Sequence, residues 1–244
     1  MSEWFEVWFN TDEYLDVYQH RNEADANALV QLILKNVNLD RNASVLDLAC
    51  GAGRHSILFA KRGFKVTAVD LSDNLLRVAK KSAEKNKVHI DLLKSDLRQF
   101  AFCKSFDLIV NLFTSFGYFE CDAENLKLFE TVNKYLSPSG YFVLDYFNKT
   151  FIENNLVKES RDNFKHSSLV QKRHIENKRV IKDIYINRNG TTERYKESVR
   201  MFSREELISA IEKAGLQIRN VFGGFKAEEF DEMNSQRIII IAQK

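Results

Sequence analysis

The chain has 244 residues, which is enough for one large domain or for one domain with an appendage. Hydrophobic residues make up 44% of it and charged residues 29%, as in a globular protein with a full core, and no apolar run approaches the roughly 20 residues of a membrane helix. Thirty-six basic residues against 34 acidic ones leave a formal charge of +2, far from the strongly basic footprint of a general nucleic-acid binder.

The N-terminus and the cysteines indicate the cellular compartment. The first ten residues hold acids and aromatics rather than a basic stretch followed by an apolar one, so the sequence predicts no signal peptide. Cys50, Cys103 and Cys121 form no C-x-x-C pair, which argues against a disulfide framework and a cysteine-built zinc site. The five histidines also lack metal-ligand spacing. We therefore expect a cytoplasmic protein without a metal site.

Residues 1–43 precede the first predicted strand and are expected to form a helical cover. Tyr14, Tyr18 and Arg21 are spaced by four and three residues, which places them on one face of a helix. Such a helix could close over a ligand, or it could simply pack on the domain. The sequence leaves both interpretations open.

From residue 44 to residue 145, short apolar runs alternate with amphipathic ones. The predicted strands are 44–48, 65–69, 88–92, 106–112 and 141–144, and the predicted helices are 55–62, 73–85 and 123–135. Strands that alternate with helices in this way imply βαβ units and a parallel sheet. Because the fourth and fifth strands are continuously apolar, we expect the sheet to be covered on both faces.

Residues 149–202 have a different pattern. After a short predicted helix at 151–157, alternating runs at 168–176, 178–188 and 191–202 predict strands, with a hairpin turn at Asn189-Gly190. Residues 149–200 contain thirteen basic and seven acidic residues, which is typical of a solvated hairpin surface. Ser203 and Glu206 then form a capping-box signature for a helix to Ala214, and strands at 216–222 and 237–242 follow.

The most informative segment is residues 47–53, DLACGAG, which follows the first strand and precedes a helix. Gly51 and Gly53 allow a tight turn and the close approach of a ligand to the helix N-terminus. Asp70 ends the second strand, where a carboxylate can accept hydrogen bonds from both hydroxyls of a ribose. Asp96 follows the third strand, where it can meet the exocyclic amine of an adenine. All these elements lie at carboxyl ends of strands, where open α/β sheets bind ligands.

A dinucleotide site is the alternative for such a turn. It would require a third glycine at the position of Ser56. Asp47, which stands before the first glycine, would attract an ammonium group and repel a phosphate. The residues therefore favour a cationic ligand over a dinucleotide, and a dehydrogenase is the alternative function.

Together, DLACGAG, the strand VTAVD that ends at Asp70, the pair Ser95-Asp96 and the strand FDLIVN that ends at Asn111 resemble the class I S-adenosylmethionine-dependent methyltransferases, in particular their small-molecule subgroup. The resemblance covers residues 40–146 and, more loosely, 203–244. It implies an α/β, Rossmann-like, doubly wound sheet of seven strands in the order 3-2-1-4-5-7-6, with the last strand antiparallel. In this division, 44–148 and 203–244 form the methyltransferase domain, and 149–202 form a β-rich insert that acts as a lid or a dimer surface.

The resemblance also implies S-adenosyl-L-methionine as cofactor and S-adenosyl-L-homocysteine as product. The glycine turn would hold the amino-acid moiety, Asp70 the ribose and Asp96 the adenine, while Tyr18 or Arg21 would meet the carboxylate. The complete set of residues expected to bind the cofactor is Asp47, Ala49, Gly51, Gly53, Asp70, Leu71, Asp96, Leu97, Asn111, Tyr18 and Arg21.

The acceptor is less clearly marked by the sequence. In-line transfer of a sulfonium methyl group needs mainly positioning and desolvation, so no strong catalytic constellation is expected. Tyr146 and Asn148 after the fifth strand, and Tyr118 in the loop after the fourth, are candidates for contact with it. The aromatic N-terminus and the insert favour an enclosed site for N, O or S methylation of a small molecule. The alternatives are a tRNA or rRNA acceptor bound by the basic insert, and a non-catalytic S-adenosylmethionine-binding module. A homodimer is compatible with the sequence.

Overall fold

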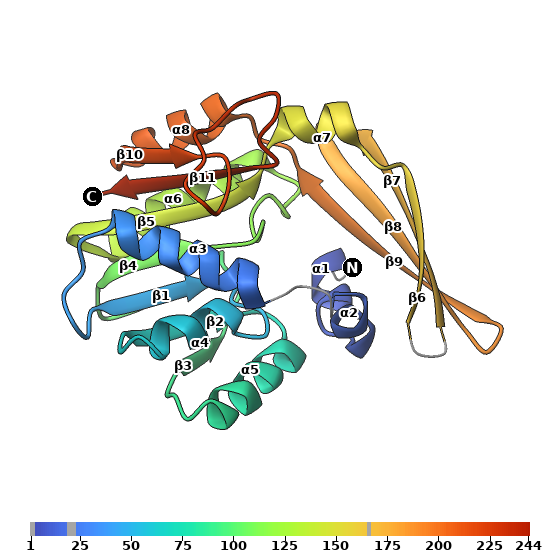
Figure 1. Ribbon diagram of the computed structural model, residues 1–244, viewed down its shortest axis with the longest axis horizontal. Coiled ribbons are helices and arrows are strands. Elements are labelled where there is room, and N and C mark those ends of the chain that lie inside the picture. Colours follow the sequence, from blue (N-terminus) through green and yellow to red (C-terminus); the bar gives the residue numbers. More distant parts are fainter. Residues whose placement is uncertain (1–2, 19–22, 165–166) are drawn as a thin grey trace.

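The computed structural model describes residues 3–18, 23–164 and 167–244. It contains a seven-stranded sheet in the order β10-β11-β5-β4-β1-β2-β3 and a separate four-stranded sheet in the order β6-β7-β8-β9 (Figure 1). The strands β1 to β5 pair in parallel, whereas β11 is antiparallel to both β5 and β10. Counted along the seven-stranded sheet, this is the order 3-2-1-4-5-7-6 with an antiparallel last strand, so the predicted fold is confirmed.

The seven-stranded sheet is covered by helices on both faces (Figure 1). Its strands are β1 (Ser44–Leu48), β2 (Lys65–Asp70), β3 (Asp91–Lys94), β4 (Phe106–Asn111), β5 (Leu136–Phe147), β10 (Gln217–Phe222) and β11 (Arg237–Gln243). The helices that cover it are α3 (Glu23–Asn36), α4 (Arg54–Ala60), α5 (Asp73–Lys85), α6 (Asp122–Tyr135) and α8 (Arg204–Lys213).

Two apolar cores lie on opposite faces of this sheet. Val45 belongs to the core that includes Phe59 of α4, while its neighbour Leu46 belongs to the core that includes Phe129 of α6 and Leu207 of α8. Successive residues of a strand point to opposite faces of the sheet, so a central strand with apolar side chains on both sides is buried on both faces. This arrangement fixes the carboxyl ends of the parallel strands at one edge of the domain.

Two strands differ from their predicted boundaries by three residues or more. β3 begins at Asp91 and not at residue 88, because the pairing with β2 starts at Thr67–Asp91; residues 88–90 form part of the connection from α5, in which Ile90 is buried against the core. β5 is longer than predicted, since Leu136 already pairs with Phe106 before the irregular register at the expected turn. Neither difference moves the acids at the strand ends.

The N-terminal segment forms two short helices, α1 (Trp4–Trp8) and α2 (Asp12–Val17), between the two sheets (Figure 1). α1 contacts β9 of the second sheet. The prediction that one helix carries Tyr14, Tyr18 and Arg21 is wrong in part, because α2 ends at Val17 and Tyr18 is its C-terminal cap. Arg21 lies outside the described residues.

The second sheet follows α7 (Lys149–Asn155) and consists of β6 (Glu159–Phe164), β7 (Ser167–Glu176), β8 (Arg179–Arg188) and β9 (Thr191–Arg200), all antiparallel. The sequence predicted three of these strands; β6, whose residues show no clear alternation, was not predicted. None of the helices in the described ranges has the length and apolar character needed to cross a membrane.

Candidate active site

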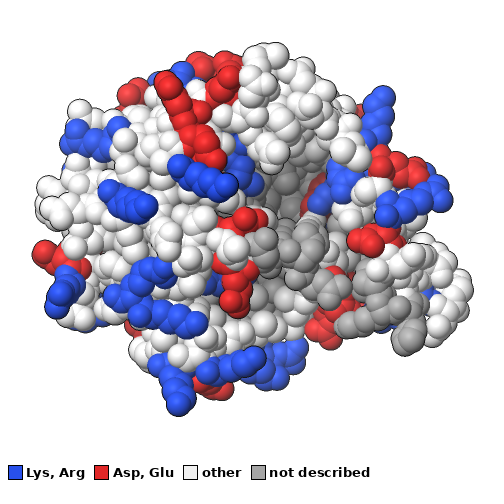
Figure 2. All heavy atoms as spheres, in the orientation of Figure 1, with Lys and Arg blue, Asp and Glu red and all other residues white. Residues whose placement is uncertain are grey.

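A cavity of about 550 Å³ lies at the carboxyl ends of the parallel strands, with walls from the seven-stranded sheet, the N-terminal helices and the second sheet. Figure 2 shows the molecule hollowed on this face, with acidic and basic side chains both bordering the hollow. Aromatic residues from three parts of the chain line it, among them Trp4, Phe9, Tyr14, Phe113, Tyr118 and Phe147. The volume and the apolar walls are those of a small-molecule site.

The structure brings most of the predicted cofactor-binding residues to this cavity. Those that line it are Asp47, Ala49, Gly51, Asp70, Leu71, Asp96, Leu97 and Tyr18, and Tyr118 lines it as well. Gly53 and Asn111 lie behind the lining. A Cβ at Gly53 would lie 2.9 Å from the Cβ of Ala79, and the Asn111 amide donates to the carbonyls of Leu48 and Ser115, both at 3.0 Å. Both residues therefore support the backbone behind the cavity wall, and neither lines the cavity itself.

Gly51 and Asp70 form one structural unit. The amide N–H of Gly51 donates to Oδ2 of Asp70 at 2.7 Å, and the amide of Ser72 donates to Oδ1 at 2.9 Å. Burial raises the pKa of the Asp70 carboxyl, while these hydrogen bonds oppose the rise. Each carboxylate oxygen can accept more than one hydrogen bond, so Asp70 keeps acceptor capacity for a ligand.

Asp47 is a buried carboxyl group that has no cationic partner among the described residues. It is 2% exposed, lines the cavity, and accepts a 2.5 Å hydrogen bond from the Ser56 hydroxyl. Burial raises its pKa to about 7, and the nearby Asp70 adds to the rise. A buried carboxylate that lacks a counter-ion fits the ammonium group of an amino acid.

Asp96 connects the third strand end to the N-terminal cover. Both of its carboxylate oxygens accept hydrogen bonds from the Arg98 guanidinium, which also donates to Glu3 at 2.6 Å. These contacts lower the pKa of Asp96 in spite of its partial burial. The carboxylate is therefore ionised and held by the chain itself at the cavity wall.

A second polar cluster joins the N-terminal helices to the second sheet. Glu197 of β9 accepts hydrogen bonds from Trp8 Nε1 at 2.8 Å and from the Tyr18 hydroxyl at 2.5 Å. Its other oxygen accepts from Lys182 of β8 at 2.7 Å, and these partners lower the pKa of Glu197 despite its burial. Tyr18, Lys182 and Glu197 all line the cavity, so this cluster closes its wall opposite the strand ends.

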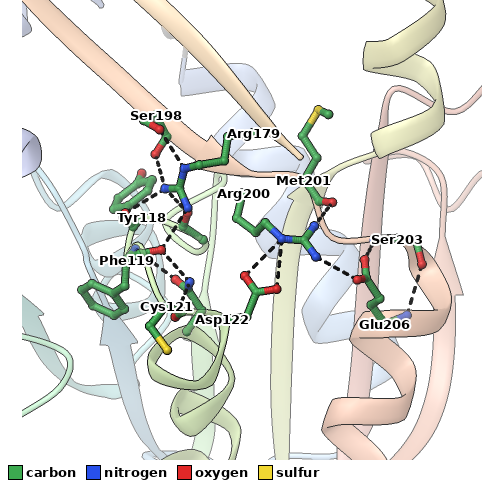
Figure 3. Close-up of polar contacts among 12 residues, drawn as sticks. Tyr118, Phe119, Cys121, Asp122, Arg179, Ser198, Arg200, Met201, Ser203 and Glu206 are labelled. Atoms are coloured by element: carbon green, nitrogen blue, oxygen red, sulfur yellow. Dashed lines mark hydrogen bonds and ion pairs between the residues drawn. The ribbon is translucent and has the colours of Figure 1, made fainter. Parts of the chain in front are cut away.

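The loop after β4 is held by Arg179 of β8 (Figure 3). This buried guanidinium donates to the carbonyl oxygens of Gly117 at 3.2 Å, Tyr118 at 3.0 Å and Phe119 at 3.0 Å, and to Ser198 on the neighbouring strand. Three successive carbonyls are thus satisfied by one side chain of the second sheet. The contacts fix the loop that presents Tyr118 to the cavity.

Arg200 anchors the end of the second sheet to two helices that cover the seven-stranded sheet. Its guanidinium donates to both carboxylate oxygens of Asp122 at 3.1 Å and to Glu206 at 2.9 Å, which joins β9 to the first turns of α6 and α8 (Figure 3). The Arg200 side chain is buried, whereas its two partners are partly exposed. The second sheet therefore has a fixed base beside the cavity.

Two of the candidate acceptor-contacting residues are not at the cavity. Tyr146 is fully buried, its hydroxyl donates to the carbonyl of Arg200, and burial raises its pKa strongly. Asn148 caps α7, and its amide donates to the carbonyls of Glu232 and Ser235. The sequence placed both at a strand end but could not show that these long-range partners occupy them, so their proposed acceptor contact is corrected to a structural role. Tyr118 alone of the three lines the cavity.

His55 is a cavity residue that the sequence analysis missed. It is buried at the start of α4, and its Nε2 has no hydrogen-bond partner within the described chain. Burial, with Arg54 and Arg237 nearby, lowers its pKa to about 3, so the ring is neutral. Its place in the first turn of the helix after the glycine turn was a signal that could have identified it, since this turn faces the ligand.

The chain matches the family model of a methyltransferase domain over residues 45–140. It is 27% identical over 218 residues, 85% of this chain and 86% of the other, to YqeM of Bacillus subtilis (strain 168), a protein assigned as a methyltransferase. A similarly assigned protein of Geobacillus sp. (strain WCH70) is 32% identical over 127 residues, so the match spans about half the length of each chain (51%). The dTDP-3-amino-3,4,6-trideoxy-alpha-D-glucopyranose N,N-dimethyltransferase of Streptomyces venezuelae is 29% identical over 113 residues, 46% of each chain.

Among solved structures, an S-adenosylmethionine-dependent methyltransferase from Clostridium acetobutylicum ATCC 824 has the same fold, with a TM-score of 0.82, 20% identity, and coverage of 95% of this chain and 98% of that one. S-adenosylmethionine is the cofactor of this family. The buried Asp47 carboxyl, which has no cationic partner among the described residues, and the Asp70 carboxylate bonded to the Gly51 amide both suit this cofactor. Residues 45–140 therefore match a methyltransferase domain, the chain is similar to proteins assigned as methyltransferases, and its seven-stranded fold is that of a solved S-adenosylmethionine-dependent methyltransferase.

Proposed function

We propose that this protein transfers the methyl group of S-adenosylmethionine to an N, O or S atom of a small molecule. The observation that carries the proposal is that Asp47, Gly51, Asp70 and Asp96 at the strand ends share one cavity with an aromatic wall built from α1, α2 and the loop after β4. Such a cavity has room for a cofactor and a small acceptor, with little water between them.

The chain's own residues supply binding and orientation. Asp47 would pair with the cofactor's ammonium group, Asp70 would accept from the ribose hydroxyls, and the wall around Asp96 would face the adenine. When bound, the cofactor supplies an electrophilic methyl carbon: the acceptor's lone pair forms the new bond, and the carbon–sulfur bond breaks with its electrons moving to sulfur. The aromatic side chains would exclude water and hold the acceptor in line, which is where most of the acceleration in such a transfer arises.

An RNA acceptor is less well supported by the contacts of the basic insert. Several of its cations already have acidic partners within the protein: Lys182 with Glu197, Arg188 with Glu13, Arg194 with Asp183, and Arg200 with Asp122 and Glu206. On the face shown in Figure 2, acidic and basic side chains are interspersed, without a continuous basic surface. An RNA-binding face would instead gather its cations in one stripe.

Similarity to the Streptomyces venezuelae relative, whose name specifies an amino-sugar nucleotide N,N-dimethyltransferase, is a second support for a small acceptor. The match covers 46% of this chain, so it supports the class of acceptor and not a particular compound.

Calorimetric titration with S-adenosylhomocysteine, with NAD as the contrasting ligand, tests the cofactor. We expect micromolar binding of the former, none of the latter, and loss of binding in Asp70→Ala, with Asp73→Ala as the control because Asp73 is exposed on α5. Binding of NAD instead would contradict the proposal.

Turnover separates an enzyme from a binding module. The protein is incubated with methyl-labelled S-adenosylmethionine and, separately, with a small-molecule cell extract or with total RNA. We expect label in the small-molecule fraction. Label in RNA would favour the RNA alternative, and tight cofactor binding without transfer to any pool would favour the non-catalytic module.

A further inference from the structure

The charges that line the cavity are divided between its walls. The carboxyl groups of Asp47, Asp70 and Asp96 lie at the ends of the parallel strands, where Arg54 at the start of α4 also lines the cavity and leaves this wall acidic overall. The second sheet contributes Arg173 of β7, Lys182 of β8 and Glu197 of β9. The acidic wall suits a cationic cofactor. The charge on the second sheet therefore indicates the charge of the methyl acceptor that binds next to the cofactor.

Lys182 does not add net charge to this wall. Its ammonium group lies 2.7 Å from the Glu197 carboxylate, and both side chains are largely buried. The two form a neutral pair that also holds the Tyr18 hydroxyl. The formal charge of the second-sheet wall is therefore that of Arg173.

Arg173 is held in place by neutral groups. It donates to Gln171 Oε1 at 2.7 Å, to Ser160 Oγ at 3.0 Å and to the carbonyl of Val157 at 3.4 Å. Throughout the described ranges it has no carboxylate partner. A guanidinium has five N–H donors, so these three bonds fix its orientation and leave two donors. A half-buried cation that is oriented but not neutralised is suited to bind an anion.

We propose that the methyl acceptor carries a carboxylate or phosphate group and that Arg173 binds it. The inference rests on the proposed function and deepens it by giving the chemical class of the acceptor. With its anionic group at Arg173, the rest of the acceptor lies along the aromatic wall that leads to the strand ends. Arg173 thereby determines specificity and takes no part in the bond that is made or broken.

Three probes with the same ring and the same amine test this: 4-aminobenzoate, 4-aminophenyl phosphate and the neutral 4-aminobenzyl alcohol. Their binding to the full chain saturated with S-adenosylhomocysteine is measured by calorimetry. We expect an anionic probe to bind about tenfold more tightly than the neutral one, as for a hydrogen-bonded charge. Whichever anion binds more tightly distinguishes a carboxylate from a phosphate acceptor.

The variant Arg173→Gln should abolish this preference and leave the affinity for S-adenosylhomocysteine unchanged. Arg161→Gln is the matched control, because Arg161 lies on the adjacent strand β6, is exposed, and pairs with Glu159 away from the cavity lining. In the turnover assay, label from S-adenosylmethionine should appear in the small molecules that an anion exchanger retains.

Equal binding of anionic and neutral probes, or an equal effect of the two variants, would overturn the inference. Loss of S-adenosylhomocysteine affinity in Arg173→Gln would also overturn it and would assign Arg173 to the cofactor's carboxylate. If the parent chain binds no S-adenosylhomocysteine at all, the proposed function fails first and the inference fails with it.

Discussion

The amide of Gly51 donates a 2.7 Å hydrogen bond to the carboxylate of Asp70, so the turn after β1 and the end of β2 share one acceptor. The same carboxylate holds the amide of Ser72, which caps α5. An acid at this position therefore orders the backbone of the proposed ligand site before any ligand binds, and it keeps acceptor capacity for a ligand. Preorganisation of this kind reduces the entropy lost on binding.

Binding of S-adenosylhomocysteine should weaken at acidic pH because of Asp47. Since the pKa of this carboxyl is raised to about 7, it is protonated below that pH and ionised above it, and only the ionised form attracts an ammonium group. Lowering the pH from 8 to 6 should reduce the affinity about tenfold by proton linkage. Calorimetry across this range checks the slope. Asp47→Asn should bind weakly with no such slope, and an equal slope in this variant would contradict the assignment.

Gly53→Ala should destabilise the protein more than Gly63→Ala. Both glycines have positive φ, 77° and 91°, but only the Cβ at Gly53 would meet another atom, the Cβ of Ala79 at 2.9 Å. The backbone strain common to both costs about 1–3 kcal/mol. The clash adds to it at Gly53, where α4 begins. Urea unfolding of the two variants measures the difference, and equal midpoints would show that α5 moves away freely.

Arg179→Met should loosen the loop that carries Tyr118. The variant removes hydrogen bonds to three carbonyls and to Ser198, and leaving buried acceptors unsatisfied should cost about 3 kcal/mol. Hydrogen exchange should then increase at the amides of residues 115–121, and Arg179→Lys should restore part of the stability. Lys172→Met, at an exposed position on β7, is the control. Unchanged exchange in the loop would mean that other contacts hold it.

Glu197→Gln should release the N-terminal helices. The change removes the charge that balances Lys182 while keeping an acceptor for Trp8 and Tyr18, and breaking a buried pair on one side should cost about 3 kcal/mol. The chain's two tryptophans both lie in α1, so a red shift of their emission would report the release. The exposed Glu193→Gln on the same strand should leave the emission unchanged.

The pH dependence of the free energy of unfolding should depend on the ionisation of Glu197. Because its partners hold the pKa of Glu197 below the ordinary value, the stabilisation is present above the pKa of the unfolded chain and is lost as the pH falls through the lower, folded value. Acid unfolding followed by tryptophan emission should therefore begin at higher pH in Glu197→Gln than in the parent chain. Coincident transitions would contradict this linkage.

The elements that the sequence predicted well are those governed by local periodicity and by short motifs. The short run of strand-forming residues in β1, the continuous apolar run of β4 and the glycine turn between β1 and α4 each need only neighbouring residues to be recognised. The order of the strands came from the resemblance of these motifs to a family. This information was sufficient to place Asp47 and Asp70 at one edge of the sheet.

The features that the sequence could not predict depend on partners far away in the chain. Tyr146 follows the expected register, but only the approach of Arg200, 54 residues later, determines that its hydroxyl is buried. Arg179 is one of many cations in the insert, and its carbonyl partners lie about 60 residues earlier. Charge patterns alone cannot distinguish such a buried clamp from a solvated surface residue, because the difference lies in desolvation and in the number of acceptors within reach.

The N-terminal helices are tied at both ends of the cavity: Glu3 bonds to Arg98 beside the third strand end, and Trp8 bonds to Glu197 on the second sheet. One movement of these helices would therefore expose the proposed cofactor-binding and acceptor-binding ends of the cavity together. We expect cofactor exchange and release of the methylated product to require the same opening of these helices. The rate of this opening would then set the maximal rate of turnover.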